Sequence, residues 1–447
     1  MTVQSRQPAA RRVYAVDVLR GIVLVLLLPD LQGGFSFYKV AQALPHSEFW
    51  AALATQFRHV DWTGVAIWDL VMPLFVFLAG VSMALSYSSR LRDGQSAVRL
   101  FGHALLRSVT LLVLGLLLQY EPQDRLDETL PVLLVSTGLP IGRWLKRWSI
   151  VQREQQASRV EAAFAVLVLA FVVVWISAHY ERLGFYDFGS QILTLLGLAY
   201  LPAFALQRYG ARTQALAALL ITAAYGGAFM LYSAPASMHP GAGVFDGWFA
   251  HWNQGANVAA AFDQWFFALL PRAQSYTGNP HDYHSLLFIA LIGVILAGSA
   301  AGRLLFEQGA SRALALRFAA ASLAGLLLSG LMSFAVAPLL KSLWTPTWSV
   351  FCVSICLLLL SALMLMLHGR ERPGWTVPLV VLGTNSILLY VLAFTQRGRI
   401  VHLWQRVLGP DLGASLPWEP LVECGLVLGT LWALAFVLYR AKIFVRI

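Results

Sequence analysis

Long apolar runs recur along the chain from residue 16 to residue 439 and are separated by short polar segments. Each run is about 20 residues long and apolar on every side, which is typical of a helix that crosses a bilayer. Strands of a membrane barrel are about 10 residues long and alternate in polarity, which this pattern does not do. The runs are 16–35, 65–88, 101–119, 160–179, 188–206, 213–232, 285–302, 314–340, 349–367, 376–395 and 421–439. They predict an all-α, polytopic helical membrane protein.

A further crossing is predicted at 129–145, although this segment is short and contains Pro131, Gly138 and Pro140. An acidic stretch precedes the segment and a basic cluster lies at its end. Such a charge difference is expected when the two ends lie on opposite sides of a membrane. With this segment the chain has about 12 transmembrane helices, and both termini lie on the same side.

The distribution of charge orients these helices. The 447-residue chain is 58% hydrophobic and 12% charged, and it carries a formal net charge of +10. If the N-terminus is inside, the inner segments hold 23 of the 32 Lys and Arg residues but 6 of the 22 Asp and Glu residues. This positive-inside pattern predicts that both termini are cytoplasmic. The membrane therefore explains the basic excess, and we expect no nucleic-acid partner.

The longest outer loop, 233–284, is rich in Trp and Phe and is expected on the periplasmic side. Aromatic rings favour the membrane interface, so residues 246–270 are predicted to form one or two helices in that layer. The whole chain, 1–447, is interpreted as a single transmembrane domain.

Polar groups within the spans mark candidate sites, because burying them in a bilayer is costly. Asp17 and Arg20 lie three residues apart on one face of the first span. They form an ion pair that orients the helix, or Arg20 faces a phosphate near the cytoplasmic surface. Asp30 follows Pro29 near the outer end of this span, where glycines also interrupt the helix. An irregular backbone together with a carboxylate at this depth predicts a cavity.

His59 and Asp69 flank the start of the second span. A neutral imidazole is the usual proton acceptor near pH 7, because its unperturbed pKa is about 6.5. His59 closes the loop that begins at Asp30, so the two side chains are expected to converge at the outer surface. A structural role is the alternative for a lone histidine. Asp69 needs a partner inside the membrane, and a buried pair with an Arg or a Trp N–H is the alternative to a direct role.

Eight motifs occur in a fixed order along the chain. They are VDVLRGI, PDLQGG, HVDWTG, WDLVMPLFVFLAGVSM, SQILTLLGLAY, KSLWTPTW, GTNSILLYV and the terminal LYRAKIFVRI. Together they resemble the heparan-α-glucosaminide N-acetyltransferase family and its bacterial relatives. The resemblance spans residues 13–447 with gaps, and the order of the motifs is more specific than any single motif.

The resemblance implies a membrane-embedded acyltransferase that moves an acetyl group from cytoplasmic acetyl-CoA to an amino sugar on the far side. It implies a catalytic role for the histidine of HVDWTG, which is His59. The lysosomal member of the family has an Asn where this chain has Asp30. A carboxylate donates no hydrogen bond to a thioester oxygen unless it is protonated. Asp30 is therefore expected to orient His59 or an acceptor ammonium instead.

Two stretches depart from the family pattern. Residues 121–187 hold two extra crossings, an even insertion that preserves the topology. The loop before 285–302 reads NPHDYHS where relatives commonly carry an acidic turn. His281 and His284 in this loop are interpreted as solvated residues or as a lid that contacts the acceptor. Their spacing alone is a weak signal for a metal, and the three cysteines all lie in apolar runs, so no metal site is expected.

The remaining candidates lie in later motifs and at the inner ends of the spans. Lys341 and Trp344 of KSLWTPTW are predicted to face the acceptor. Asn385 and Ser386 lie within a span, where they contact acyl-CoA or form hydrogen bonds between helices. The arginines expected to bind the phosphates of CoA are Arg20, Arg90 and Arg107.

The sequence thus predicts an acyl-CoA-dependent transmembrane N-acetyltransferase of the bacterial inner membrane, with an amino sugar or glycan as acceptor. It leaves open a homodimer, and it does not separate direct transfer from transfer through an acetyl-histidine. The alternative class is a proton-coupled transporter of sugars or glycan fragments, in which Asp30, His59 and Asp69 carry the protons. A third interpretation is a scaffold of the same family that has lost catalysis.

Overall fold

The computed structural model shows the chain as a bundle of helices. It describes residues 13–31, 33–119, 191–233, 245–269, 276, 278–279, 283–370, 372–409 and 416–444. In these residues the secondary structure is helical, and strand pairing is limited to two isolated bridges. Seven of the described helices are long and apolar enough to cross a membrane, and one bent pair makes an eighth span if it counts as one. The predicted polytopic helical membrane protein is confirmed, whereas twelve crossings and cytoplasmic termini stay predictions.

Most helices follow the predicted runs closely, whereas α15 (Ser386–Leu408) continues 13 residues past the predicted end of its run at 395. The longer elements are α1 (Tyr14–Leu27), α4 (Val71–Arg92), α5 (Ala97–Gln119), α8 (Ile192–Ala205), α9 (Ala211–Leu231), α11 (Leu287–Gln308), α12 (Arg312–Ala335), α13 (Pro346–Met366), α15 (Ser386–Leu408) and α16 (Glu419–Arg440). The shorter elements are α2 (Phe37–Ala43), α3 (Glu48–Gln56), η1 (Ile67–Leu70), η2 (Gly247–Trp252), α10 (Val258–Ala268), η3 (Gly374–Thr376) and α14 (Val377–Gly383). The predicted crossings 129–145 and 160–179, and with them the insertion 121–187, lie outside the described residues.

Two predicted spans are interrupted at polar residues. α1 ends at Leu27, two residues before Pro29, because a proline has no backbone N–H to continue the helical hydrogen bonds and its ring clashes with the preceding turn. The predicted run 376–395 divides into α14 and α15, whose axes differ by 71° around Thr384 and Asn385. Irregular backbone at membrane depth is stable only where it is buried in protein or lines a cavity. Both interruptions are therefore places to look for a site.

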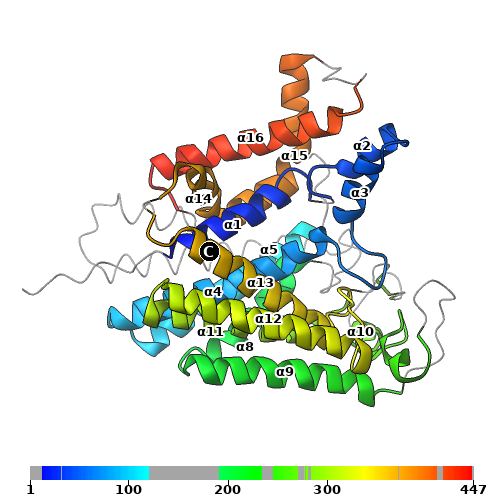
Figure 1. Cartoon of the computed structure of the whole chain (residues 1–447), viewed down its shortest axis with the longest axis vertical. Coiled ribbons are helices and arrows are strands. Elements are labelled where there is room, and N and C mark those ends of the chain that lie inside the picture. The colour runs from blue at the N-terminus through cyan, green and yellow to red at the C-terminus, as the bar shows by residue number, and fades with distance from the viewer. Residues whose placement is uncertain are drawn as a thin grey trace, which may run out of the picture.

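Glycines allow close packing of α4 against α11 in the centre of the bundle. A Cβ on Gly80 would lie 2.0 Å from the carbonyl oxygen of Ile295, and one on Gly298 would lie 2.2 Å from that of Phe77. Membrane helices associate through such small residues because no hydrophobic driving force operates between helices in lipid. In Figure 1, α1, α14 and α16 lie on one side of α13, and α9, α11 and α12 lie on the other.

Short helices cover one end of the bundle. η2 and α10 fall within 246–270, where one or two helices are predicted. α2 and α3 lie in the loop between α1 and α4 and are not predicted by the sequence pattern. Figure 1 shows α2, α3 and α10 at the same end of the molecule. We call this the outer end.

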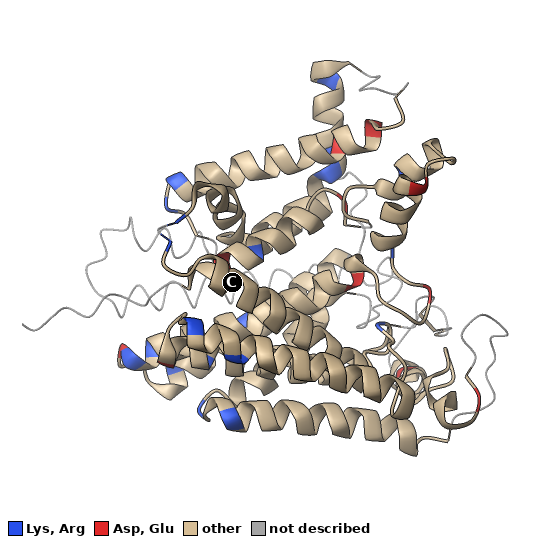
Figure 2. Ribbon diagram, viewed as in Figure 1, with Lys and Arg blue, Asp and Glu red and all other residues tan. Residues whose placement is uncertain are grey.

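Basic residues gather at the opposite end, which we call the inner end. The last turns of α4 and α16 carry Arg90, Arg92 and Arg440. Figure 2 shows Lys and Arg concentrated where α4, α9, α11, α12 and α16 reach this end. The clustering agrees with the positive-inside pattern of the sequence.

Candidate functional site

His59 and Asp69 meet at the outer end of the second predicted span. η1 turns the chain so that the Asp69 side chain is fully buried. Its Oδ2 atom accepts a hydrogen bond from the backbone N–H of Ala66 at 3.2 Å. Its Oδ1 atom lies 2.7 Å from Nδ1 of His59. A buried carboxylate requires such partners, and this one orients the imidazole.

Lys341 joins this pair from 282 residues further along the chain. Its Nζ lies 3.1 Å from Oδ1 of Asp69, 2.7 Å from Nδ1 of His59 and 3.3 Å from Nε2 of His59. The Lys341 side chain is 6% exposed, whereas that of His59 is 49% exposed. The ion pair is therefore inside the protein, and the imidazole is open to a substrate.

Two anchors on neighbouring loops hold Lys341 beside the histidine. Thr63 and Leu340 pair as an isolated antiparallel bridge. Thr345 caps the N-terminus of α13, because its Oγ1 accepts from the backbone N–H of Trp348 at 3.3 Å. Lys341 lies between these anchors, so loop geometry determines its position.

The histidine and the lysine border a cavity of about 230 Å³, which we call the outer cavity. The ring of Tyr283 also borders it, with its centroid 5.6 Å from Nζ of Lys341, a cation–π contact. The other lining residues are mostly apolar. They are Leu27, Leu31, Trp68, Val71, Met72, Phe75, Gln191, Ile192, Tyr390 and Phe394.

A larger cavity of about 570 Å³, the inner cavity, lies nearer the basic end of the bundle. Four residues predicted to bind acyl-CoA line it: Arg20, Arg90, Arg107 and Ser386. The Arg20 guanidinium lies 3.1 Å from Asp17 and donates to Oγ of Ser82 at 2.7 Å and to the carbonyl of Gly383 at 3.2 Å. Arg20 is thus both the partner of Asp17 and a wall of the cavity. The structure brings these four residues together from α1, α4, α5 and α15.

Phe75 lines both cavities. It lies on α4 between Asp69 at the outer end and Arg90 at the inner end, a helical path of about 30 Å at 1.5 Å per residue. The ring of Tyr390 lies beside it, with the two centroids 6.5 Å apart. The two cavities therefore follow one another along α4 and share Phe75 as a common wall.

Asp30 lies close to the outer cavity but does not line it. Its carboxylate accepts a hydrogen bond from the hydroxyl of Ser36, which in turn lies 3.5 Å from the thiol of Cys424 on α16. Asp69, and not Asp30, is the carboxylate that the structure places 2.7 Å from the imidazole. The contacts of Asp30 join the broken end of α1 to α16.

Asn385 and Trp344 also lie outside both cavity walls. Asn385 is fully buried at the break between α14 and α15, and its Nδ2 donates to the carbonyl of Ile443 at 3.2 Å. Trp344 is fully buried and adopts a positive φ of 49° in the turn after Lys341. Asn385 therefore joins the helix break to the C-terminal segment, and Trp344 packs beneath the lysine turn.

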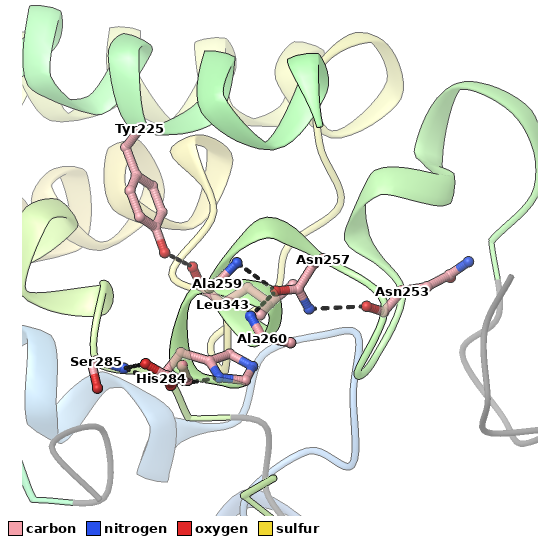
Figure 3. A network of polar contacts seen from close by, with 9 residues as sticks. Tyr225, Asn253, Asn257, Ala259, Ala260, His284, Ser285 and Leu343 are labelled. Carbon is pink, nitrogen blue, oxygen red and sulfur yellow. Dashed lines mark hydrogen bonds and ion pairs between the residues drawn. The ribbon is translucent and has the colours of Figure 1, made fainter. Parts of the chain in front are cut away.

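A second buried network joins the outer loop to the bundle (Figure 3). Asp263 of α10 is fully buried, and its Oδ2 lies 3.0 Å from Nδ1 of His284. The same carboxylate accepts from the backbone N–H of Ser285 at 3.0 Å. The side chain of His284 is 2% exposed, so it is not the solvated residue that one interpretation of the loop predicts. The network holds the segment that begins with Tyr283 against α10.

The other loop histidine, His281, lies outside the described residues, as does Asp282. Within the part of the chain that the structure describes, no group of three or more His, Cys, Asp or Glu side chains is placed to hold a metal ion.

Four residues of these sites are missed by sequence reasoning: Phe75, Tyr283, Tyr390 and Asp263. The two residues Phe75 and Tyr390 look like any other apolar positions of a span. Asp263 carries a usable signal, because it is the single charge in the apolar helix VAAAFDQWFFA. A charge at such a position predicts a buried partner.

Comparison with known proteins agrees with the motifs, although no protein-family profile matches the chain. The chain is 33% identical over 115 residues to the heparan-alpha-glucosaminide N-acetyltransferase of Mus musculus, and 35% identical over 107 residues to that of Homo sapiens. The matches cover 26% and 24% of this chain but 15% and 14% of the two relatives. They support the assignment, predicted from the ordered motifs, of this chain to the heparan-alpha-glucosaminide N-acetyltransferase family.

Proposed function

We propose that this protein is an acyltransferase of the bacterial inner membrane that moves an acyl group from cytoplasmic acyl-CoA to an amino sugar or glycan on the periplasmic side. One observation carries the proposal. The His59–Asp69–Lys341 cluster borders a cavity that shares Phe75 with a second cavity lined by arginines. An acyl-CoA bound across the two cavities would have its thioester near the base in the outer cavity and its phosphates near the arginines in the inner cavity.

The inner cavity suits the phosphates of the donor. Several phosphates need several fixed cations, and Arg20, Arg90 and Arg107 converge there from three helices. Within the described part of the chain, Nε of Arg107 is buried without a hydrogen-bond partner, and its guanidinium lies 4.9 Å from the centroid of Tyr200. A buried guanidinium N–H that lacks an acceptor fits a site for an anionic ligand. Ser386 would contact the pantetheine arm.

His59 is proposed to act as the general base. With Nδ1–H donating to Asp69, the imidazole lone pair is on Nε2, 3.3 Å from Nζ of Lys341, and this lone pair is assigned the proton of the acceptor amine. The amine nitrogen forms the new bond to the thioester carbonyl carbon, and the C–S bond breaks. The proton held on Nε2 then passes to the departing thiolate, so that free CoA and the acylated acceptor leave. Transfer through an acetyl-imidazole uses the same residues in two steps.

Lys341 is proposed to stabilise the negative charge that develops on the carbonyl oxygen. Its ammonium is within 3.3 Å of both imidazole nitrogens, so a carbonyl presented to the imidazole lies within its reach. A preorganised cation in a site from which water is largely excluded is an effective stabiliser of an oxyanion. Tyr283, whose ring faces the same ammonium, would contact the acceptor. Asp30 is assigned a positioning role at the broken end of α1.

A proton-coupled transporter is the competing function, and one observation favours it. The break between α14 and α15, with Asn385 buried in it, resembles the discontinuous helices that bind substrates in secondary transporters. A transporter of this kind would not bind CoA in the arginine-lined inner cavity. Calorimetric titration of the purified protein with CoA separates the two functions.

The direct test uses the purified protein in lipid nanodiscs with acetyl-CoA and a panel of amino sugars. Wild type should transfer the acetyl group, and His59→Ala should lose about 10²- to 10⁴-fold in rate, which is the usual contribution of a general base. His59→Ala should still bind CoA, because the imidazole lies away from the inner cavity. His402, an exposed histidine of α15, provides the matched control, and His402→Ala should transfer at the wild-type rate. Equal turnover by wild type and His59→Ala would exclude the histidine as the base.

A further inference from the structure

The wall of the outer cavity is largely hydrocarbon. Leu27 and Leu31 at the end of α1, Met72 and Phe75 on α4, and Phe394 on α15 supply much of it. The polar lining is confined to a few side chains, among which the half-exposed imidazole and the lysine ammonium stand together. We call the part of the cavity beside the half-exposed His59 imidazole its mouth, and the part lined by these apolar side chains its interior.

A sugar does not suit this apolar interior. Each sugar hydroxyl that leaves water needs a hydrogen-bond partner, and an unpaired one weakens binding. Aliphatic and phenyl side chains offer no such partner. An amino sugar is therefore expected at the mouth, beside His59 and Tyr283, and the interior is left for an apolar group.

The interior is also too large for an acetyl group alone. A methyl group is similar in size to one water molecule, whose share of liquid volume is about 30 Å³. The outer cavity measures about 230 Å³. Because an apolar cavity of this size gains stability when hydrocarbon fills it, a longer chain fits the site better than acetyl does.

We infer that the outer cavity is an acyl-chain pocket and that the donor carries a chain longer than acetyl. This inference rests on the proposed function and names its donor more closely. The thioester would lie beside His59, with the chain directed away from the mouth along Met72 and Leu31. Phe75, shared by both cavities, would contact the pantetheine arm where it passes from the inner cavity to the outer one.

The test is the affinity of the purified protein in nanodiscs for acetyl-, butyryl-, hexanoyl- and octanoyl-CoA. Each CH₂ group buried in the pocket should raise the affinity about fourfold, which corresponds to about 0.8 kcal/mol, until the pocket is full. Met72→Phe, which fills part of the pocket, should lower the octanoyl-to-acetyl affinity ratio. Met230→Phe makes the same change on α9, outside both cavities, and should keep the wild-type ratio. If Met72→Phe fails to fold, Leu31→Phe tests the same wall.

The outcomes separate this inference from the proposed function. An affinity that stays flat from acetyl- to octanoyl-CoA overturns the acyl-chain pocket while leaving the acetyltransferase intact. A rise that Met72→Phe and Leu31→Phe leave unchanged shows that the chain binds elsewhere, and it overturns the pocket as well. Failure to bind any of the four donors, acetyl-CoA included, contradicts the proposed function itself.

Discussion

Asp69 determines which nitrogen of His59 can act as a base. A neutral imidazole carries one proton, and the nitrogen that bears it is set by the hydrogen bond that this nitrogen makes. The Asp69 carboxylate accepts hydrogen bonds only, so it holds that proton on Nδ1 and leaves the lone pair on Nε2, which lies 3.3 Å from Nζ of Lys341. The nearby Lys341 ammonium balances the charge of the buried carboxylate. The three side chains therefore work as one unit.

Asp69→Asn should lose activity on the scale of a missing general base, about 10²-fold or more. The amide keeps the shape of the side chain but removes its charge, so neither the tautomer nor the lysine remains fixed. Acetyl transfer by the purified variant measures the effect. Asp30→Asn makes the same change at a carboxylate whose described partner is Ser36, and it should lose much less. A larger loss for Asp30→Asn than for Asp69→Asn would reverse the roles assigned to the two carboxylates.

Arg20→Ala should raise the KM for acyl-CoA about tenfold or more and leave the KM for the acceptor nearly unchanged. The expected size follows from the loss of a charge-assisted hydrogen bond, about 1.5–3 kcal/mol. Arg312→Ala is the matched control, because Arg312 is exposed at the inner end of α12 and does not line the cavity. If calorimetry finds the same CoA affinity in Arg20→Ala and wild type, Arg20 serves only to join Asp17, Ser82 and Gly383.

The sequence predicts some of these residue pairings and not others. His59 and Asp69 are ten positions apart and flank one span, so their meeting can be anticipated. Lys341 is 282 residues away from His59, and only the pairing of two loops brings it there. Asp30 is expected near His59 because His59 closes the loop that begins at Asp30, but its carboxylate turns toward Ser36 and α16. Side-chain direction after a helix break depends on tertiary contacts that the sequence pattern does not contain.

The helices themselves are easier to predict than their interruptions. Apolar runs of about 20 residues identify the spans, because a bilayer requires this length. The 71° bend between α14 and α15 lies inside one predicted run, 376–395, because the short polar stretch Thr384, Asn385 and Ser386 does not by itself indicate a break in an apolar span. α2 and α3 are short, and α3 is mostly exposed, so their helical pattern is weak. Bends and short surface helices arise from packing, which periodicity does not report.

Gly80→Val should destabilise the fold more than the same change at Gly102. A side chain at Gly80 would meet the backbone of Ile295 on α11, and overpacking of this kind typically costs about 1–3 kcal/mol. Gly102 on α5 has no atom within 4 Å of a Cβ built there. Thermal unfolding of the two purified variants compares them directly. Equal midpoints would show that α4 and α11 separate to accommodate the valine.

The whole molecule places its two chemical environments at opposite ends. The arginine-lined cavity lies nearer the end where basic residues gather, and the His59 cluster lies at the end covered by α2, α3 and α10 (Figures 1 and 2). Positive residues are retained on the cytoplasmic side of a membrane, where acyl-CoA is also made available to enzymes. The same charge asymmetry that orients the chain would therefore present the inner cavity to its donor.

This orientation leads to a prediction for the topology. Reporter fusions at Ser237, in the loop 233–284, and at the C-terminus should report opposite sides of the membrane, with the C-terminus cytoplasmic. The reason is the distribution of charge: the inner segments contain 23 Lys and Arg residues and 6 Asp and Glu residues, whereas the rest of the chain contains 9 Lys and Arg residues and 16 Asp and Glu residues. A fusion after Arg159 tests the crossing at 129–145, because that crossing places the basic segment 143–161 inside. Identical signals at Ser237 and the C-terminus would remove the twelve-helix topology, and they would also put the His59 cluster and the acceptor on the same side as the donor.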